Sequence, residues 1–116
     1  LSYSAIDPVP ATLSAKMMRI IRDEIGFGGL IMTDDISMKA LTGAPADIAR
    51  ASIAAGCDVA LLCNADLKTR RGVAEASGEM GPVAQARAEA ALAARRTPDE
   101  VDIPALEAKL SAIMGG

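Results

Sequence analysis

A short apolar segment that ends in two adjacent aspartates constrains this chain more than any other feature. Residues 30–32 (Leu-Ile-Met) follow the glycines at 28–29 and lead through Thr33 into Asp34 and Asp35. An apolar run this short suits a strand that is buried on both faces, as in a parallel sheet. Ligands bind at the carboxyl ends of parallel strands. Asp34 is therefore the first residue to consider for chemistry.

The same pair also suits a structural role. Carboxylates at the start of a helix accept hydrogen bonds from its free backbone N–H groups and face the positive end of the helix dipole. The local pattern does not decide between capping and catalysis, because motifs this short have many false positives. The two roles are also compatible, with one aspartate capping while the other points into a pocket.

Length and composition allow a single domain with a thin core. The chain has 116 residues, of which 51% are hydrophobic, but much of that fraction is alanine and the only aromatic residues are Tyr3 and Phe27. The formal net charge of −3 argues against binding to nucleic acid or to anionic membranes, since both require basic patches. No apolar run approaches the ~20 residues of a membrane span, and no signal peptide opens the chain. We therefore expect a cytoplasmic protein.

The first residue, the two cysteines and the absence of histidine each carry information. The chain begins with Leu1 rather than methionine, which suggests a piece of a longer protein. Cys57 and Cys63 are too few for a disulfide framework, and we expect both to be reduced core residues. The sequence contains no histidine.

The order of the predicted elements is that of an α/β protein. A strand, a helix and a second strand at 30–33, 46–55 and 59–63 predict a right-handed βαβ unit. The basic residues Lys68, Arg70 and Arg71 are interpreted as a solvated loop. The other predictions are the end of a strand at 1–6, a helix from Thr12 or Ser14 to about Ile25 that is closed by Gly26 and Phe27, a helical turn at 37–41, and helices at 82–96 and 104–114.

Four stretches in order resemble one known family. Residues 26–38 (Gly-Phe-Gly-Gly-Leu-Ile-Met-Thr-Asp-Asp-Ile-Ser-Met) look like the nucleophile signature of glycoside hydrolase family 3. More narrowly, they resemble the bacterial β-N-acetylhexosaminidases of peptidoglycan recycling. Residues 5–8, 10–14 and 55–64 fit the same branch. Four matches in sequence order are far more specific than any one of them.

The resemblance implies an α/β fold, the last strands and helices of a (β/α)₈ TIM barrel followed by C-terminal helices. Residues 1–66 would supply the C-terminal βα units of the barrel, about its final quarter to third. Residues 67–116 would form a helical extension that packs on the outside or bottom of the barrel. Because such barrels usually need about 250 residues, the N-terminal two thirds of the catalytic domain would be absent. That missing part would be the main protein partner.

The resemblance also implies a reaction. It is the retaining hydrolysis of terminal β-linked N-acetylglucosamine from peptidoglycan-derived muropeptides, without metal or cofactor. Asp34 aligns with the catalytic nucleophile, and Asp35, Ser37 and Met38 would support the loop and the pocket floor. In this branch the acid/base group is a histidine on a loop earlier in the barrel. This chain has no histidine and cannot supply that group.

Two alternatives come from other functional classes. One is a catalytically inactive barrel fragment, because two strands with helices on one face seldom hold together alone. The other is a receiver-like phosphoacceptor domain, which has similar length and a cluster of aspartates. Such a domain needs a lysine at the end of a later strand, and the strand predicted to end at Cys63 has none. Magnesium-dependent phosphorylation would identify the receiver.

Overall fold

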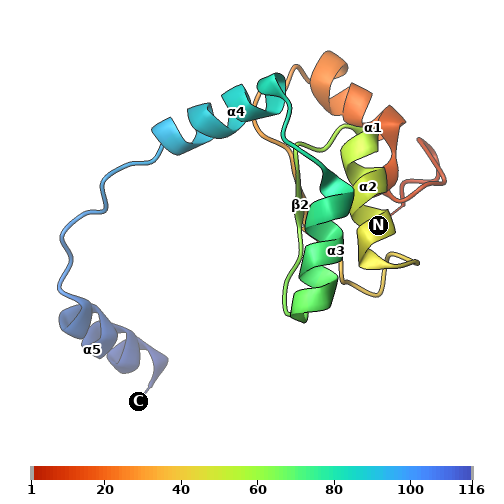
Figure 1. Cartoon of the computed structure of the whole chain (residues 1–116). Helices are drawn as coiled ribbons and strands as arrows, with labels where there is room; N and C mark the ends of the chain where they lie inside the picture. The colour runs from red at the N-terminus through yellow and green to blue at the C-terminus, as the bar shows by residue number, and fades with distance from the viewer. Residues whose placement is uncertain (1, 116) are drawn as a thin grey trace.

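A computed structural model describes residues 2–115 and shows an α/β body followed by two helices that lead away from it (Figure 1). The two strands are β1 (Met32–Asp35) and β2 (Val59–Leu61), which pair in parallel. Among the described residues, no helix is long and apolar enough to cross a membrane. The helices are η1 (Ala11–Leu13), α1 (Ala15–Arg19), the π-helix η2 (Ile20–Glu24), α2 (Pro45–Ala55), α3 (Leu67–Ser77), α4 (Pro82–Ala93) and α5 (Ile103–Met114).

The body is a strand–helix–strand unit with α3 packed beside α2, as Figure 1 shows. The predicted sequence of strand, helix and strand is therefore confirmed. α2 begins at Pro45, which suits the first turn of a helix because proline has no N–H to donate. It ends at Gly56, whose φ of 120° strongly disfavours residues with a side chain. The core consists of Ile36, Ile48, Ala49 and Val73, with Leu13, Leu41, Ala60 and Leu62 packed against it.

The first strand differs from the prediction in position and in burial. It begins at Met32 rather than at residue 30, and it includes both aspartates instead of ending before them. Burial on both faces is wrong for this chain, since Thr33 is 5% exposed and its neighbour Met32 is 55% exposed. The cause is that the helices of the chain cover only one face of the strand pair. The second strand ends at Leu61, two residues before the predicted end.

The predicted strand at 1–6 is wrong over the described residues, and Leu1 lies outside them. The amides of Ile6 and Asp7 both donate to the Tyr3 carbonyl, at 2.7 and 2.9 Å, and close a tight turn. Within the described residues, no strand pairs with this segment, so its backbone hydrogen bonds are made locally.

The first long helix has the predicted caps but an irregular interior. The Ser14 hydroxyl accepts from the Met17 amide at 3.0 Å, which confirms the N-cap. At the other end Gly26 has a φ of 75°, and the Phe27 amide donates to the Ile21 carbonyl at 3.0 Å, as in a Schellman motif. Between the caps the helix changes from α1 to the wider η2, which the residue spacing did not predict.

The prediction missed α3 and placed its basic residues in a loop. Asp66 caps this helix by accepting from the Thr69 amide at 2.7 Å, and Val73 is its buried residue. Lys68, Arg70 and Arg71 therefore lie on a helix. The apolar stripe is too sparse for its periodicity to be recognised from the sequence.

The two C-terminal helices agree with the predictions and have no buried residues. α4 ends at Ala93, three residues before the predicted end, and α5 starts one residue early at Ile103. Both lead away from the body in Figure 1. The radius of gyration is accordingly 18.5 Å, against about 13 Å for a compact domain of this size. Packing of these helices on a barrel remains a prediction.

A buried carboxylate holds four segments of the chain together. The Asp58 side chain is 5% exposed and accepts from the Ile31 amide at 2.8 Å, from Arg22 at 2.6 Å and from Arg87 at 2.8 Å. Arg22 also donates to the carbonyls of Phe27 and Gly29. Burial alone raises the pKa of Asp58, but the amide hydrogen bond and the two guanidinium charges outweigh burial and lower it.

We predict that Asp58→Ala lowers the free energy of unfolding by about 3–5 kcal/mol, because it leaves the Arg22 charge and the Ile31 N–H buried without a partner. Urea unfolding followed by circular dichroism measures this loss. The matched control is Arg50→Ala. Its ion pair with Asp47 is largely exposed, and its loss should cost about 0.5 kcal/mol or less.

The same carboxylate predicts the direction of the pH dependence. Because the folded pKa of Asp58 is lower than the unfolded value of about 3.9, its contribution is present above that pH and is lost as pH falls through the folded pKa. The unfolding free energy of the unmodified chain should therefore fall more steeply in acid than that of Asp58→Ala. Equal stability of the two proteins at pH 7 would contradict this account.

Both cysteines are free, as predicted. Cys57 lies between α2 and β2 and is buried, and burial raises the pKa of its thiol. We predict that Cys57→Ala and Cys63→Ala each cost about 1 kcal/mol or somewhat more in unfolding free energy, because they remove packed side-chain atoms. Neither should alter the catalytic mechanism of an enzyme that contains the chain. Loss of turnover in a folded, stable Cys63→Ala protein would refute this.

Candidate functional site

The two aspartates of β1 have different surroundings. Asp35 is half-buried, and both of its carboxylate oxygens accept hydrogen bonds. One oxygen accepts from the amides of Ser37 and Cys63, at 3.0 and 3.1 Å, and the other accepts from the Ser37 hydroxyl at 2.7 Å. These three donors, the Ser37 hydroxyl foremost, lower the pKa of Asp35. Asp35 is therefore ionised, and its carboxylate joins the start of the following loop to the segment just after β2.

Asp34 lies on the opposite, open face of β1. Its side chain is exposed, and within residues 2–115 it accepts one hydrogen bond, from the Asp35 amide at 2.8 Å. A carboxylate with this many free lone pairs is available to a ligand, whereas that of Asp35 is engaged. No helix in the described part of the chain begins at this point, so Asp35 is not a helix cap; it holds the turn that follows β1 and leaves Asp34 available for chemistry.

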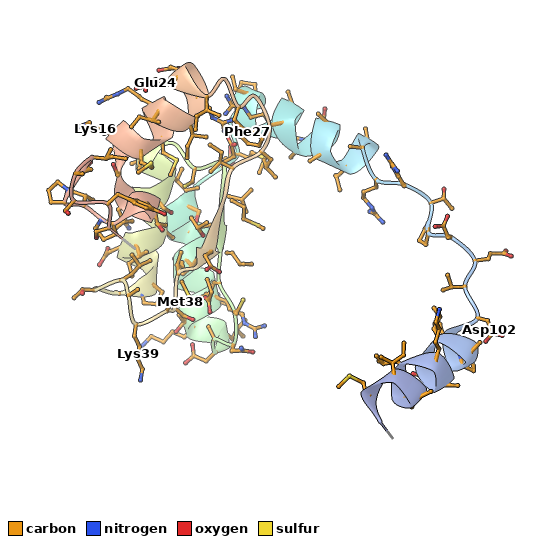
Figure 2. All side chains as sticks on the ribbon, turned by 180° about the vertical axis from the view of Figure 1, so that it is seen from behind. Lys16, Glu24, Phe27, Met38, Lys39 and Asp102 are labelled. Atoms are coloured by element: carbon orange, nitrogen blue, oxygen red, sulfur yellow. The ribbon has the colours of Figure 1, made fainter. Side chains whose placement is uncertain are left out.

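Ser37 and Met38 follow the pair in a tight loop. The Met38 amide donates to the Asp35 carbonyl at 3.2 Å, and the Leu41 amide donates to the Met38 carbonyl at 3.1 Å. The predicted helical turn at 37–41 is therefore two successive turns. Met38 is exposed and lies with Lys39 at the end of the body opposite Glu24 and Phe27, as Figure 2 shows. Ser37 acts on Asp35, and Met38 is free to contact a ligand at this end.

β1 and β2 are joined by side chains as well as by backbone. Met32 pairs with Val59 and Asp35 pairs with Leu61, so that β1 has one residue more than β2 between the two pairs. The Thr33 hydroxyl accepts from the Leu61 amide at 2.9 Å. Asp34 therefore lies inside a β-bulge, a feature that often redirects a side chain beside an active site. No pattern in the sequence predicts this bulge.

An open groove of about 210 Å³ lies between the first helical segment and β1. Met18 and Ile21 line its helical side, Met32 and Asp34 line its strand side, and Cys57 also borders it. Its walls are largely apolar, and Asp34 is the acidic residue among them. This combination suits a ligand that offers an apolar face and a centre that reacts with a carboxylate.

Asp7 and Asp66, which follow the segments predicted as strands, are engaged in local hydrogen bonds. Asp7 accepts from the Ser14 hydroxyl at 2.6 Å and from the Val9 amide at 3.0 Å, and these bonds lower its pKa. The hydrogen bonds of Asp66 to Thr69, which begin α3, lower its pKa as well. A general acid needs a raised pKa, so neither aspartate is suited to that role in this chain. Within the described residues, no three His, Cys, Asp or Glu side chains lie together as a metal site.

Comparisons with known proteins show the family of the chain. Residues 1–96 match the family described as Glycosyl hydrolase family 3 N terminal domain. The chain is 40% identical over 88 residues to a β-hexosaminidase of Thioalkalivibrio sulfidiphilus, an alignment that covers 73% of this chain and 25% of the relative. It is 39% identical over 114 residues to a β-hexosaminidase of Aromatoleum aromaticum, covering 90% of this chain and 30% of the relative.

A third relative, the β-hexosaminidase of Alkalilimnicola ehrlichii, is 45% identical over 65 residues, which are 53% of this chain and 19% of the relative. The chain thus spans between about a fifth and a third of the length of these relatives.

Proposed function

Because the chain belongs to glycosyl hydrolase family 3, we propose that it carries the catalytic nucleophile of a β-hexosaminidase, and that this nucleophile is Asp34. The observation that supports the assignment is the division of the aspartate pair. Asp35 is held by three hydrogen-bond donors, whereas Asp34 is exposed on the open face of β1. A nucleophile must reach the substrate, and only Asp34 is free to do so.

The fold we propose for the complete protein is a (β/α)₈ barrel. β1 and β2 would be its last two strands, with residues 1–66 forming the C-terminal βα units and residues 67–116 a helical extension. The exposed Met32 and Asp34 support this, because the inner face of a barrel strand is covered only when the other strands are present. Catalytic residues lie at the carboxyl ends of barrel strands, which is the position of Asp34 in β1.

The proposed reaction is retaining hydrolysis. Asp34 attacks the anomeric carbon of the sugar, the glycosidic bond breaks, and the leaving oxygen takes a proton from a general acid. Water then attacks the glycosyl–Asp34 ester and restores the carboxylate. Asp35 and Ser37 orient the loop, and Met38 contributes to the pocket floor.

The general acid comes from outside this chain in our proposal. Retaining enzymes place the second group about 5–5.5 Å from the nucleophile. Asp35 is engaged by the turn that follows β1, and Asp7 and Asp66 have lowered pKa values. The sequence has no histidine. The rest of the barrel must therefore supply the acid/base and most of the sugar contacts.

The substrate we propose is terminal β-linked N-acetylglucosamine on peptidoglycan-derived muropeptides, hydrolysed in the cytoplasm. The three relatives described above are named β-hexosaminidases, which supports a hexosamine at the cleaved position. The leaving group and the compartment rest on the resemblance of residues 26–38 to the peptidoglycan-recycling branch.

We predict that Asp34→Asn, made in the complete enzyme, removes nearly all turnover of an aryl N-acetyl-β-glucosaminide, because the amide cannot form the glycosyl ester. Asp35→Asn is the matched control, with the same change one residue later. It should cost at most about 10²-fold in kcat, the scale expected for a misplaced catalytic group. A greater loss for Asp35→Asn would show that the assignment within the pair is wrong.

The 116-residue chain alone should not hydrolyse glycosides at any pH. General acid–base catalysis typically contributes 10²–10⁴-fold, and the lost sugar contacts remove positioning as well. The test is to assay the purified chain with an aryl N-acetyl-β-glucosaminide over a broad pH range, with and without the preceding part of the barrel. Turnover by the chain alone that Asp34→Asn abolishes would contradict the prediction and would make Asp7 or Asp66 the acid/base to examine.

A further inference from the structure

We propose that Thr33 is a positioning residue for Asp34, and that its hydroxyl holds the bulge that directs the Asp34 carboxylate to the open face of the sheet. This inference rests on the proposed role of Asp34 as nucleophile. It concerns a residue that acts through Asp34, because Thr33 is 5% exposed and its hydroxyl is bonded to the Leu61 amide.

The two residues that flank Asp34 bind β2 and the segment directly after it through their side chains. The Thr33 hydroxyl accepts from the Leu61 amide at 2.9 Å, and the Asp35 carboxylate accepts from the Cys63 amide at 3.1 Å. The Leu61 carbonyl in turn accepts from the Ile36 amide at 2.9 Å. Asp34 therefore lies between two residues, Thr33 and Asp35, whose side chains are hydrogen-bonded to the neighbouring segment.

These attachments lie where the register of the two strands changes. Between the backbone pairs Met32–Val59 and Asp35–Leu61 there are two residues in β1 and one in β2. In a ladder without the bulge, Asp34 would lie opposite Leu61 in place of Asp35. The hydroxyl of Thr33 keeps the Leu61 N–H satisfied in the bulged arrangement, and a buried N–H without a partner is costly.

Loss of the hydroxyl should therefore act on the backbone of β1. A valine at this position has the same shape but cannot accept the Leu61 hydrogen bond. The strand then either leaves this N–H unpaired or shifts toward a regular ladder. A one-residue change of register turns each side chain to the other face of a sheet. Even a partial shift moves the Asp34 carboxylate away from the anomeric carbon.

The kinetic test compares Thr33→Val, Thr33→Ser and Ser52→Ala in the complete enzyme. Thr33→Val should lower kcat by about 10²-fold, the scale expected when a catalytic group is misplaced by about 1 Å, with KM little changed. Thr33→Ser keeps the hydroxyl and should retain most of the rate. Ser52→Ala removes another fully buried hydroxyl, which bonds the Ala49 carbonyl at 2.9 Å, and should leave kcat unchanged.

Two further measurements keep the inference testable. Thr33→Ala and Thr33→Ser differ only in the hydroxyl, so this pair serves if the valine variant does not fold. In the 116-residue chain, the Leu61 amide should exchange slowly with deuterated solvent in the unmodified protein and in Thr33→Ser, and much faster in Thr33→Val.

The outcomes separate this inference from the proposed function. If Asp34→Asn abolishes turnover but folded Thr33→Val keeps its kcat, Asp34 is the nucleophile and Thr33 does not position it. An equal loss of kcat in Thr33→Val and Ser52→Ala would also overturn the inference, because it would reflect general destabilisation. Retained turnover in Asp34→Asn would instead refute the proposed function itself.

Discussion

The path of the chain into its first strand depends on one buried carboxylate and the cation beside it. Asp58 binds the Ile31 amide directly before β1, and Arg22 binds the same carboxylate together with the carbonyls of Phe27 and Gly29. The glycine-rich segment between helix and strand would otherwise have little side-chain packing to fix its course. Because the residues at 27–31 lead straight into β1, this ion pair also sets where Asp34 and Asp35 begin their pairing with β2. Arg87 extends the network to α4, so the same charge anchors the helical extension to the body.

At the other end of the strands, side chains accept hydrogen bonds from backbone amides of the neighbouring segment. Asp35 binds both the loop that follows it and the segment just after β2, and Thr33 binds the last residue of β2. Both side chains are less exposed than Asp34, which lies with Met32 on the open side of the strand. The arrangement gives a physical reason for two adjacent acids. Asp35 has a structural role, and fixed hydrogen-bond donors satisfy its charge. Asp34 is held in place by its neighbours, but no cation neutralises its charge within the described residues.

Features with local causes could be predicted from the sequence, and features with distant causes could not. The cap at Ser14, the glycine turn at Gly26, and the helices α2, α4 and α5 follow from residues within a few positions of each other. The aspartate pair was recognised in the same way, although its division of roles required the structure. The Asp58 carboxylate binds residues 27 to 36 positions away, and the bulge depends on a hydroxyl and an amide 28 positions apart. The spacing of apolar residues along the sequence does not predict contacts between residues so far apart. The two-faced burial predicted for the first strand failed for a related reason, since covering its open face requires strands outside this chain.

The central claim is that Asp34 forms a covalent bond to the sugar, and the most direct measurement is to trap that bond. A 5-fluoro-N-acetylglucosaminyl fluoride combines a good leaving group with a ring fluorine that slows hydrolysis of the glycosyl–enzyme. The complete enzyme would be incubated with this reagent, digested and sequenced by mass spectrometry. The account predicts one added glycosyl group on the peptide that contains Asp34, located at that residue by fragmentation and absent from Asp34→Asn. A label on Asp35, or on any residue outside β1, would contradict it.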